Sequence, residues 1–210
     1  MKKKYLKDIA YETLKEMILL GELNGPVITE QQLVDMLNIS RTPIRGALQR
    51  LDNNDNLIEI LPKRGILIKE LSVKETIDLM DLRLAIELFS FKKIKKNFND
   101  QHLRVLDKLV EQQKIYIDNN EISNFIKSDI EYHKVFLDIY DNNHFHKVLD
   151  NITDRIFLHG IKIFTKNPER LQESFKDHIL LNDCLRRENF DEAEKMLENH
   201  ISKGKSLYLS

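Results

Sequence analysis

The first part of the chain spaces its apolar residues as short α-helices do. The apolar set of the first predicted helix is Leu6, Ile9, Ala10, Leu14, Met17 and Ile18. The glycine- and proline-containing segment 21–26 ends this helix. A second predicted helix follows Thr29, which can cap it. A third follows Ser40 and carries Pro43 in its first turn, where proline is tolerated. The apolar side of this third helix consists of Ile44, Ala47, Leu48 and Leu51.

Two short β-branched runs, 57–61 and 65–68, follow the third helix and complete a winged helix-turn-helix pattern. From Ser72 onward the pattern is helical throughout. Ser72 to Glu75 is a capping-box sequence that opens a helix to about Phe98. Further helices are expected at roughly 100–118, 122–141, 143–165, 168–187 and 190–208. The chain is therefore predicted to be mostly α: a winged helix-turn-helix over residues 1–70 and an antiparallel helical bundle over residues 71–210.

Composition excludes several classes of protein. The 210 residues are 41% apolar and 32% charged, enough for a packed core and too apolar for a disordered chain. The formal net charge of -1 confines any site for a polyanion to a local patch. The single cysteine, Cys184, excludes an internal disulfide framework. No apolar run is long enough for a membrane span or a secretory signal, so we expect a cytoplasmic protein.

The third predicted helix carries a face suited to DNA. Opposite its apolar side lie Thr42 and Gln49, flanked by Arg45 and Arg50, with Arg41 at the entrance. In a major groove, arginine reads guanine and glutamine reads adenine. The turn between the two strands adds Lys63 and Arg64, placed to contact phosphate or an adjacent minor groove. An ordinary solvated helix face is the alternative for the charges alone, but the order of the elements favours DNA binding.

The string Ile39 to Leu51, which reads ISRTPIRGALQRL, resembles the recognition helix of the GntR family of bacterial transcription regulators. The segments 29–33 and 63–65 also resemble that family. The resemblance implies groove and phosphate contacts for Arg41 and Arg45 and phosphate contacts for Ser40 and Thr42. It also implies that Gly65 lets the wing backbone approach DNA.

Three positions depart from the family's pattern. Gly46 stands where glutamate is usual, and Gln31 stands where relatives often carry arginine. The approach to the wing, residues 53–57, lacks the usual glycine, and an asparagine there can take the left-handed conformation instead.

The second part of the chain carries a candidate metal site. Asp129 and His133 are four residues apart and project from one face of a predicted helix. His178 and His200 lie on later helices that an antiparallel bundle can bring to the same point. One carboxylate and three imidazoles suit Zn²⁺, Ni²⁺ or Mn²⁺. The alternative is that these are core histidines with ordinary hydrogen bonds.

The same features, in the same order, resemble the FCD-type ligand domain of the FadR subfamily of GntR regulators. The resemblance implies that Asp129, His133, His178 and His200 are metal ligands, with zinc as the first choice and nickel or manganese as alternatives. It places the chain in the metal-containing branch. The four remaining histidines are expected to be structural or at the surface: His102, His144, His146 and His159.

The resemblance also points Arg83 and Arg155 toward the cavity, where a guanidinium could bind a small carboxylate bidentately. For Arg83, the alternative is an ion pair with Glu87 one helical turn on.

Together these features predict a homodimeric transcription regulator, not an enzyme, that binds a double-stranded DNA operator. A small organic acid bound by the metal and Arg83 would control operator binding. Two alternatives remain open. One is a metal-dependent hydrolase that activates water at the ion, and the other is a regulator whose metal is purely structural.

Overall fold

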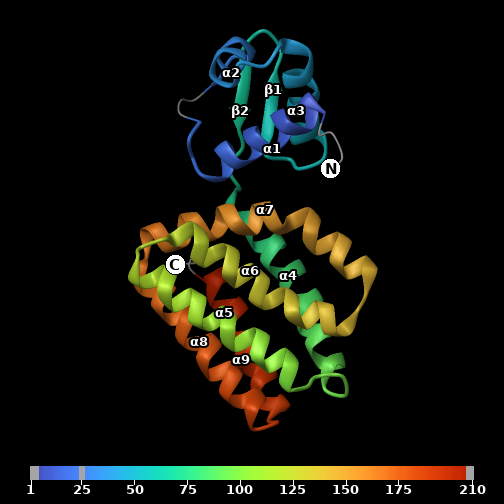
Figure 1. The fold of residues 1–210 in the computed structure, drawn as a ribbon, viewed down its shortest axis with the longest axis vertical. Coiled ribbons are helices and arrows are strands. Elements are labelled where there is room, and N and C mark those ends of the chain that lie inside the picture. Colours follow the sequence, from blue (N-terminus) through green and yellow to red (C-terminus); the bar gives the residue numbers. More distant parts are fainter. Residues whose placement is uncertain (1–4, 24–26, 207–210) are drawn as a thin grey trace. The chain divides into compact units, whose positions relative to one another are not determined.

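The computed structural model describes residues 5–23 and 27–206, which form nine α-helices and one two-stranded sheet (Figure 1). The chain divides into two compact units, Met1–Glu70 and Leu71–Ser210. The elements of the first unit are α1 (Leu6–Leu19), α2 (Glu30–Leu37), α3 (Arg41–Asn53), β1 (Ile58–Leu61) and β2 (Gly65–Ile68). Those of the second are α4 (Val73–Ile94), α5 (Asp100–Asp118), α6 (Ile122–Tyr140), α7 (Asn143–Lys166), α8 (Pro168–Arg186) and α9 (Phe190–Ser206). The predicted fold class is confirmed.

In the first unit, α3 packs its apolar side against α1. Ala10 and Leu14 on α1 and Ile44, Leu48 and Leu51 on α3 are all buried. Burial of these side chains removes apolar surface from water, the main driving force for docking the two helices. The opposite face of α3 is left exposed.

The predicted caps of the first unit differ in their chemistry. Thr29 caps α2 and forms a reciprocal capping box with Gln32. Ser40 occupies the N-cap position of α3, but its side chain makes no capping hydrogen bond. Of the segment predicted to end α1, Gly21 has a positive φ of 69°, and residues 24–26 lie outside the described part of the chain.

The hairpin that forms the wing pairs Ile58 with Ile68 at one end and Leu61 with Gly65 at the other. Gly65 has a φ of 122°, and a Cβ there would lie 2.7 Å from the carbonyl oxygen of Ile28. Glycine is therefore required by the backbone of the wing itself. Asn56 has a φ of 54° and takes the left-handed conformation in the approach to the wing, which contains no glycine.

The helices of the second unit form one bundle. The predicted capping box of α4 is present at Ser72 and Glu75. α4 ends at Ile94 rather than near the predicted Phe98: the chain makes one further turn, in which the amides of Asn97 and Phe98 both donate to the carbonyl oxygen of Ile94, and Asn99 then caps α5. Phe98 then packs against the core instead of extending the helix.

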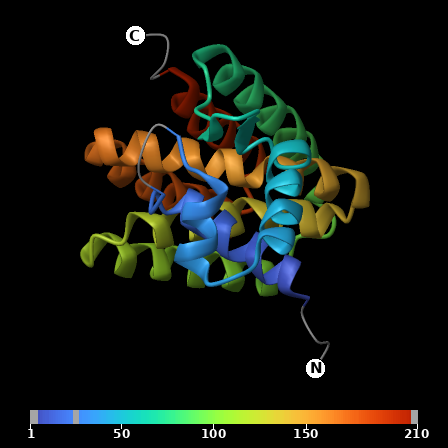
Figure 2. The same ribbon diagram turned by 90° about the horizontal axis from the view of Figure 1, so that it is seen from above.

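The central helix of the bundle is α6, which packs against α4, α5 and α7 (Figures 1 and 2). Its buried side chains include Phe125, Tyr132 and Phe136, none of them measurably exposed. Polar residues on a helix enclosed in this way must find partners inside the protein. Within the described residues, no helix has the length and apolar character needed to cross a membrane.

Candidate metal centre

Four side chains predicted to bind metal lie together inside the bundle. Asp129 and His133 come from α6, His178 from α8 and His200 from α9, and their nearest ligand atoms lie within 4.8 Å of one another. Nε2 of His133 is 3.1 Å from Nε2 of His200 and 3.4 Å from Nε2 of His178. Nitrogens bound tetrahedrally at about 2.0–2.1 Å from one zinc ion are about 3.3 Å apart. The spacing therefore fits a single ion.

Each of these imidazoles has its other nitrogen next to an acceptor from a different element. Nδ1 of His133 lies 2.6 Å from a carboxylate oxygen of Glu87 on α4, at ion-pair distance but without the alignment of a hydrogen bond. Nδ1 of His178 lies 2.9 Å from the amide oxygen of Gln113 on α5, and Nδ1 of His200 lies 3.3 Å from Asp177 on α8. An acceptor at Nδ1 fixes the tautomer in which Nε2 is free to bind a metal. The three acceptors turn all three Nε2 atoms toward one centre.

The electrostatics give these groups the protonation states that a metal requires. Burial acts to raise the pKa of Asp129, but the neighbouring histidines and Arg83 bring it below its ordinary value. Burial likewise opposes ionisation of Glu87, yet Arg83 lowers its pKa to about 2. Burial lowers the pKa of His178 well below its ordinary value and that of His200 to about 4. At neutral pH the carboxylates are charged and these two imidazoles are neutral, as ligands must be.

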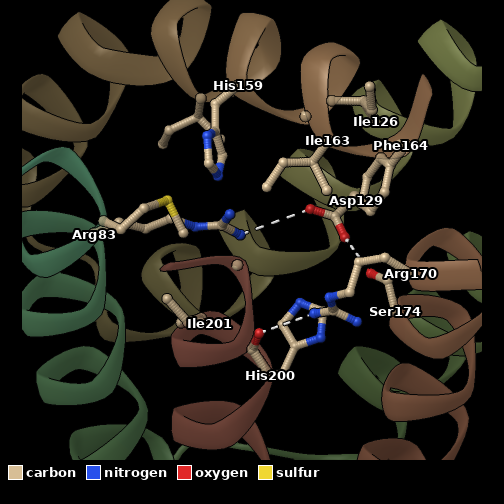
Figure 3. A pocket seen from close by; sticks show the side chains of 14 residues that line it. Arg83, Ile126, Asp129, His159, Ile163, Phe164, Arg170, Ser174, His200 and Ile201 are labelled. Atoms are coloured by element: carbon tan, nitrogen blue, oxygen red, sulfur yellow. Dashed lines mark hydrogen bonds and ion pairs between the residues drawn. The ribbon is translucent and has the colours of Figure 1, made fainter. Parts of the chain in front are cut away.

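A pocket adjoins this cluster (Figure 3). The pocket is partly open to solvent, and its cavity volume, measured as the space open to the centres of water molecules, is about 40 Å³. Its apolar walls include isoleucines of α6 and α7. Its polar lining consists of Arg83, Asp129, His159, Arg170, Ser174 and His200. A small molecule that enters this pocket can therefore reach Asp129 and His200 of the cluster.

Arg83 is both an ion-pair partner and a pocket residue. Its Nε lies 2.6 Å from Glu87. Its Nη2 lies 3.7 Å from Asp129, an ion pair that Figure 3 marks with a dashed line. Arg155, predicted to share this role, does not line the pocket, and its guanidinium lies 3.8 Å from Glu75. The structure therefore brings together Arg83 and the four candidate ligands but leaves Arg155 outside.

Two further pocket residues were not predicted as site residues. Arg170 and His159 are each more than nine-tenths buried and line the same pocket. No second residue at ligand spacing accompanies His159 in the sequence, and Arg170 lies in an ordinary helix start, so neither carried a signal of a site.

In the winged unit, the candidate DNA-reading side chains are exposed, as are Lys63 and Arg64 at the tip of the hairpin. Nε of Arg45 lies 2.8 Å from Glu30, and Arg41 donates a 2.6 Å hydrogen bond to Gln31. Both partners stand on α2, which thus orients the two arginines along α3.

The other predicted DNA contacts on α3 and at its N-cap divide into two groups. Ser40, Thr42 and Gln49 are exposed to solvent. Arg50 instead stacks on the ring of Tyr11, 3.6 Å from its centroid. Arg50 therefore contributes to the packing of α3 on α1 and is less free for DNA than Arg45.

A winged helix-turn-helix followed by a helical bundle with an internal polar site is the architecture of a DNA-binding transcription regulator. Two family profiles match the chain: "Bacterial regulatory proteins, gntR family" over residues 6–68 and "FCD domain" over residues 78–203. The chain belongs to the GntR family of transcription regulators and carries an FCD domain, consistent with the FadR-like subfamily.

Similar proteins agree with this assignment. The HTH-type transcriptional repressor NanR of Klebsiella aerogenes is 26% identical, covering 95% of this chain and 84% of the relative. The gluconate operon transcriptional repressor of Bacillus subtilis is 25% identical, covering 91% of this chain and 71% of the relative. A transcriptional regulator GntR from Rhodococcus sp. RHA1 shares the fold, with a TM-score of 0.80 at 15% identity and 97% coverage of both chains. The chain is a regulator and not an enzyme, so the hydrolase alternative is set aside.

Proposed function

We propose that this regulator binds its operator through α3 and the wing, and that a small organic acid held at a metal ion in the bundle controls this binding. The main support for this proposal is one observation: Arg83 lines a pocket beside four clustered side chains, those of Asp129, His133, His178 and His200. One relative is named as the repressor of a gluconate operon, and gluconate is itself an organic acid, which supports this class of effector.

The four clustered residues would hold the ion. Three imidazoles and one carboxylate suit zinc, and nickel and manganese accept the same donors. When bound, the ion supplies a positive charge that attracts a carboxylate. Arg83 would bind a second edge of that carboxylate, since guanidinium and carboxylate groups pair through two parallel hydrogen bonds.

For the operator, Arg45 and Gln49 would contact base edges, while Ser40, Thr42 and Arg41 contact phosphates or the groove. Arg50, Lys63, Arg64 and Gly65 would add contacts from the end of α3 and the wing. We propose a homodimer, because two recognition helices on paired half-sites supply the specificity that one lacks. Exposed Leu82 and Phe89, seven residues apart on α4, offer an apolar surface for a second copy.

The test is a titration of protein bound to a duplex that the wild type selects from random DNA. A panel of small organic acids is added to the metal-loaded wild type and to the Arg83→Ala variant. One acid should change operator affinity in the wild type. The variant should respond only at acid concentrations about tenfold higher or more, because it lacks the guanidinium that pairs with the carboxylate of the acid. Replacement of exposed Arg104 by alanine is the matched control and should respond as the wild type does.

Equal responses of the wild type and Arg83→Ala would refute the role of Arg83. The purely structural metal gives a different pattern: a chelator lowers the melting temperature, but no acid changes operator affinity in any variant. Thermodynamic linkage adds a check. If an acid changes the affinity of the protein for its operator by some factor, the operator must change the affinity of the protein for that acid by the same factor.

A further inference from the structure

Arg170 is buried in the first turn of α8 with part of its guanidinium unsatisfied. The residue is 7% exposed. Its Nη2 donates a 3.2 Å hydrogen bond to the carbonyl of His200, but Nε and Nη1 have no hydrogen-bond acceptor among the described residues. The carboxylates nearest to Nη1, those of Glu173 and Asp177, lie 3.7 and 3.8 Å away. A buried charged donor without an acceptor is costly, so this group is suited to an acceptor from outside the protein.

Arg170 and Arg83 reach the same pocket from different helices (Figure 3). Arg83 extends from α4 toward Asp129, and Arg170 extends from α8 toward His200. The apolar wall of the same pocket includes Ile126, Ile156 and Ile163. Such a wall suits a short hydrocarbon segment with an acidic group at each end.

The balance of buried charge favours a ligand with two negative charges. The cations Arg83 and Arg170 balance the anions Glu87 and Asp129, since all four are at least nine-tenths buried. Asp177 is balanced separately by Lys203, whose Nζ lies 2.9 and 3.1 Å from its two oxygens. A divalent ion would therefore leave two positive charges in the interior. An anion with one charge neutralises only half of this excess, and unpaired buried charge is strongly unfavourable.

We propose that the ligand of this pocket is a short dicarboxylate, with one carboxylate at the metal and Arg83 and the other at Arg170. This inference rests on the proposed function, because it uses the same site. It assigns Arg170 the selection of dicarboxylates over monocarboxylates of equal length.

The experiment is calorimetric titration of the metal-loaded full chain with matched pairs of acids: malonate and propanoate, succinate and butanoate, glutarate and pentanoate. At least one dicarboxylate should bind ten times or more as tightly as its partner, which corresponds to about 1.4 kcal/mol. Arg170→Gln should remove that preference and leave monocarboxylate affinity within about twofold. Arg170→Lys should restore part of it, because the positive charge returns.

Arg186→Gln is the matched control, an arginine on the same helix that is half-exposed and paired with Asp107; it should keep the preference. Metal content should be equal in all variants, since none removes a candidate ligand. Monocarboxylates that bind as well as dicarboxylates in the wild type would overturn this inference alone. An equal loss of both classes in Arg170→Gln would also overturn it, as a sign of a structural role. Failure of every acid to bind would overturn the proposed function as well.

Discussion

Glu87 offers a sharp test of how the candidate metal site is organised. Its side chain is 1% exposed, one oxygen lies 2.6 Å from Nε of Arg83, and the other lies 2.6 Å from Nδ1 of His133. Glu87→Gln keeps the size of the side chain but replaces one oxygen by an amide group that donates. Either Arg83 or His133 then faces a donor instead of an acceptor. In the wild type, Arg83 donates a hydrogen bond to one oxygen of Glu87, and Nδ1 of His133 has the other oxygen at ion-pair distance.

We expect Glu87→Gln to weaken metal binding about 10–100-fold, the usual effect of losing the residue that orients a histidine ligand. This corresponds to about 1.4–2.7 kcal/mol. The measurement is competition between the metal-free protein and a chromophoric chelator for Zn²⁺ at neutral pH. Glu198→Gln, an exposed change two residues from His200, is the control and should bind as the wild type does.

The variant's circular dichroism and melting curve in the metal-free state show whether the bundle is intact. A folded Glu87→Gln protein with the zinc affinity of the wild type would refute the argument that Glu87 orients His133.

Four further predictions address other parts of the molecule. Elemental analysis of protein purified without chelator should find about one divalent transition ion per chain, with a sharp loss in His133→Ala and none in His102→Ala; equal contents would contradict the site. Arg45→Ala should weaken binding to a selected duplex by about 1–3 kcal/mol, measured by fluorescence anisotropy, and unchanged binding would contradict a base contact. Burial lowers the pKa of His159 to about 4, so the unfolded chain, with a pKa of about 6.5, takes up a proton first as the pH falls. Urea denaturation should therefore show stability present above about pH 6.5 and lost toward pH 4, by up to about 3 kcal/mol, with a flatter profile in His159→Gln. A Cβ at Gly46 would meet no atom within 4 Å, so Gly46→Ala should stabilise the winged unit by about 1 kcal/mol, and a lower midpoint of unfolding would contradict this.

Local rules account for most of what the sequence predicted correctly. The capping boxes at Thr29 and Ser72 depend on side chains three residues apart, and both are present. The shared helix face of Asp129 and His133 depends on a spacing of four residues, and the two lie together in the structure. Such features involve neighbours within one turn, so the pattern of residues suffices to place them.

The rest of the site depends on how whole helices rotate and pack. Gln113 on α5 meets His178 on α8, 65 residues later, and no spacing rule connects them. Arg170 and His159 enter the pocket through the packing of α7 and α8 against α6. Arg155 was expected at the cavity and is not found there: the resemblance to the FCD-type domain pointed its side chain toward the cavity, but its guanidinium lies near Glu75. Side chains this long can reach either of two neighbours, and only the packing decides between them.

The wide separation of the clustered residues along the chain has a consequence for kinetics. His133 is 45 residues from His178 and 67 from His200, so closing these loops is an unfavourable event that precedes any complete site. An ion would then find its ligands only after α6, α8 and α9 have docked. Its stabilising effect should appear as slower unfolding, with little change in the rate of folding. The lifetime of the folded bundle in a cell would therefore follow the supply of the metal, even where its rate of formation does not.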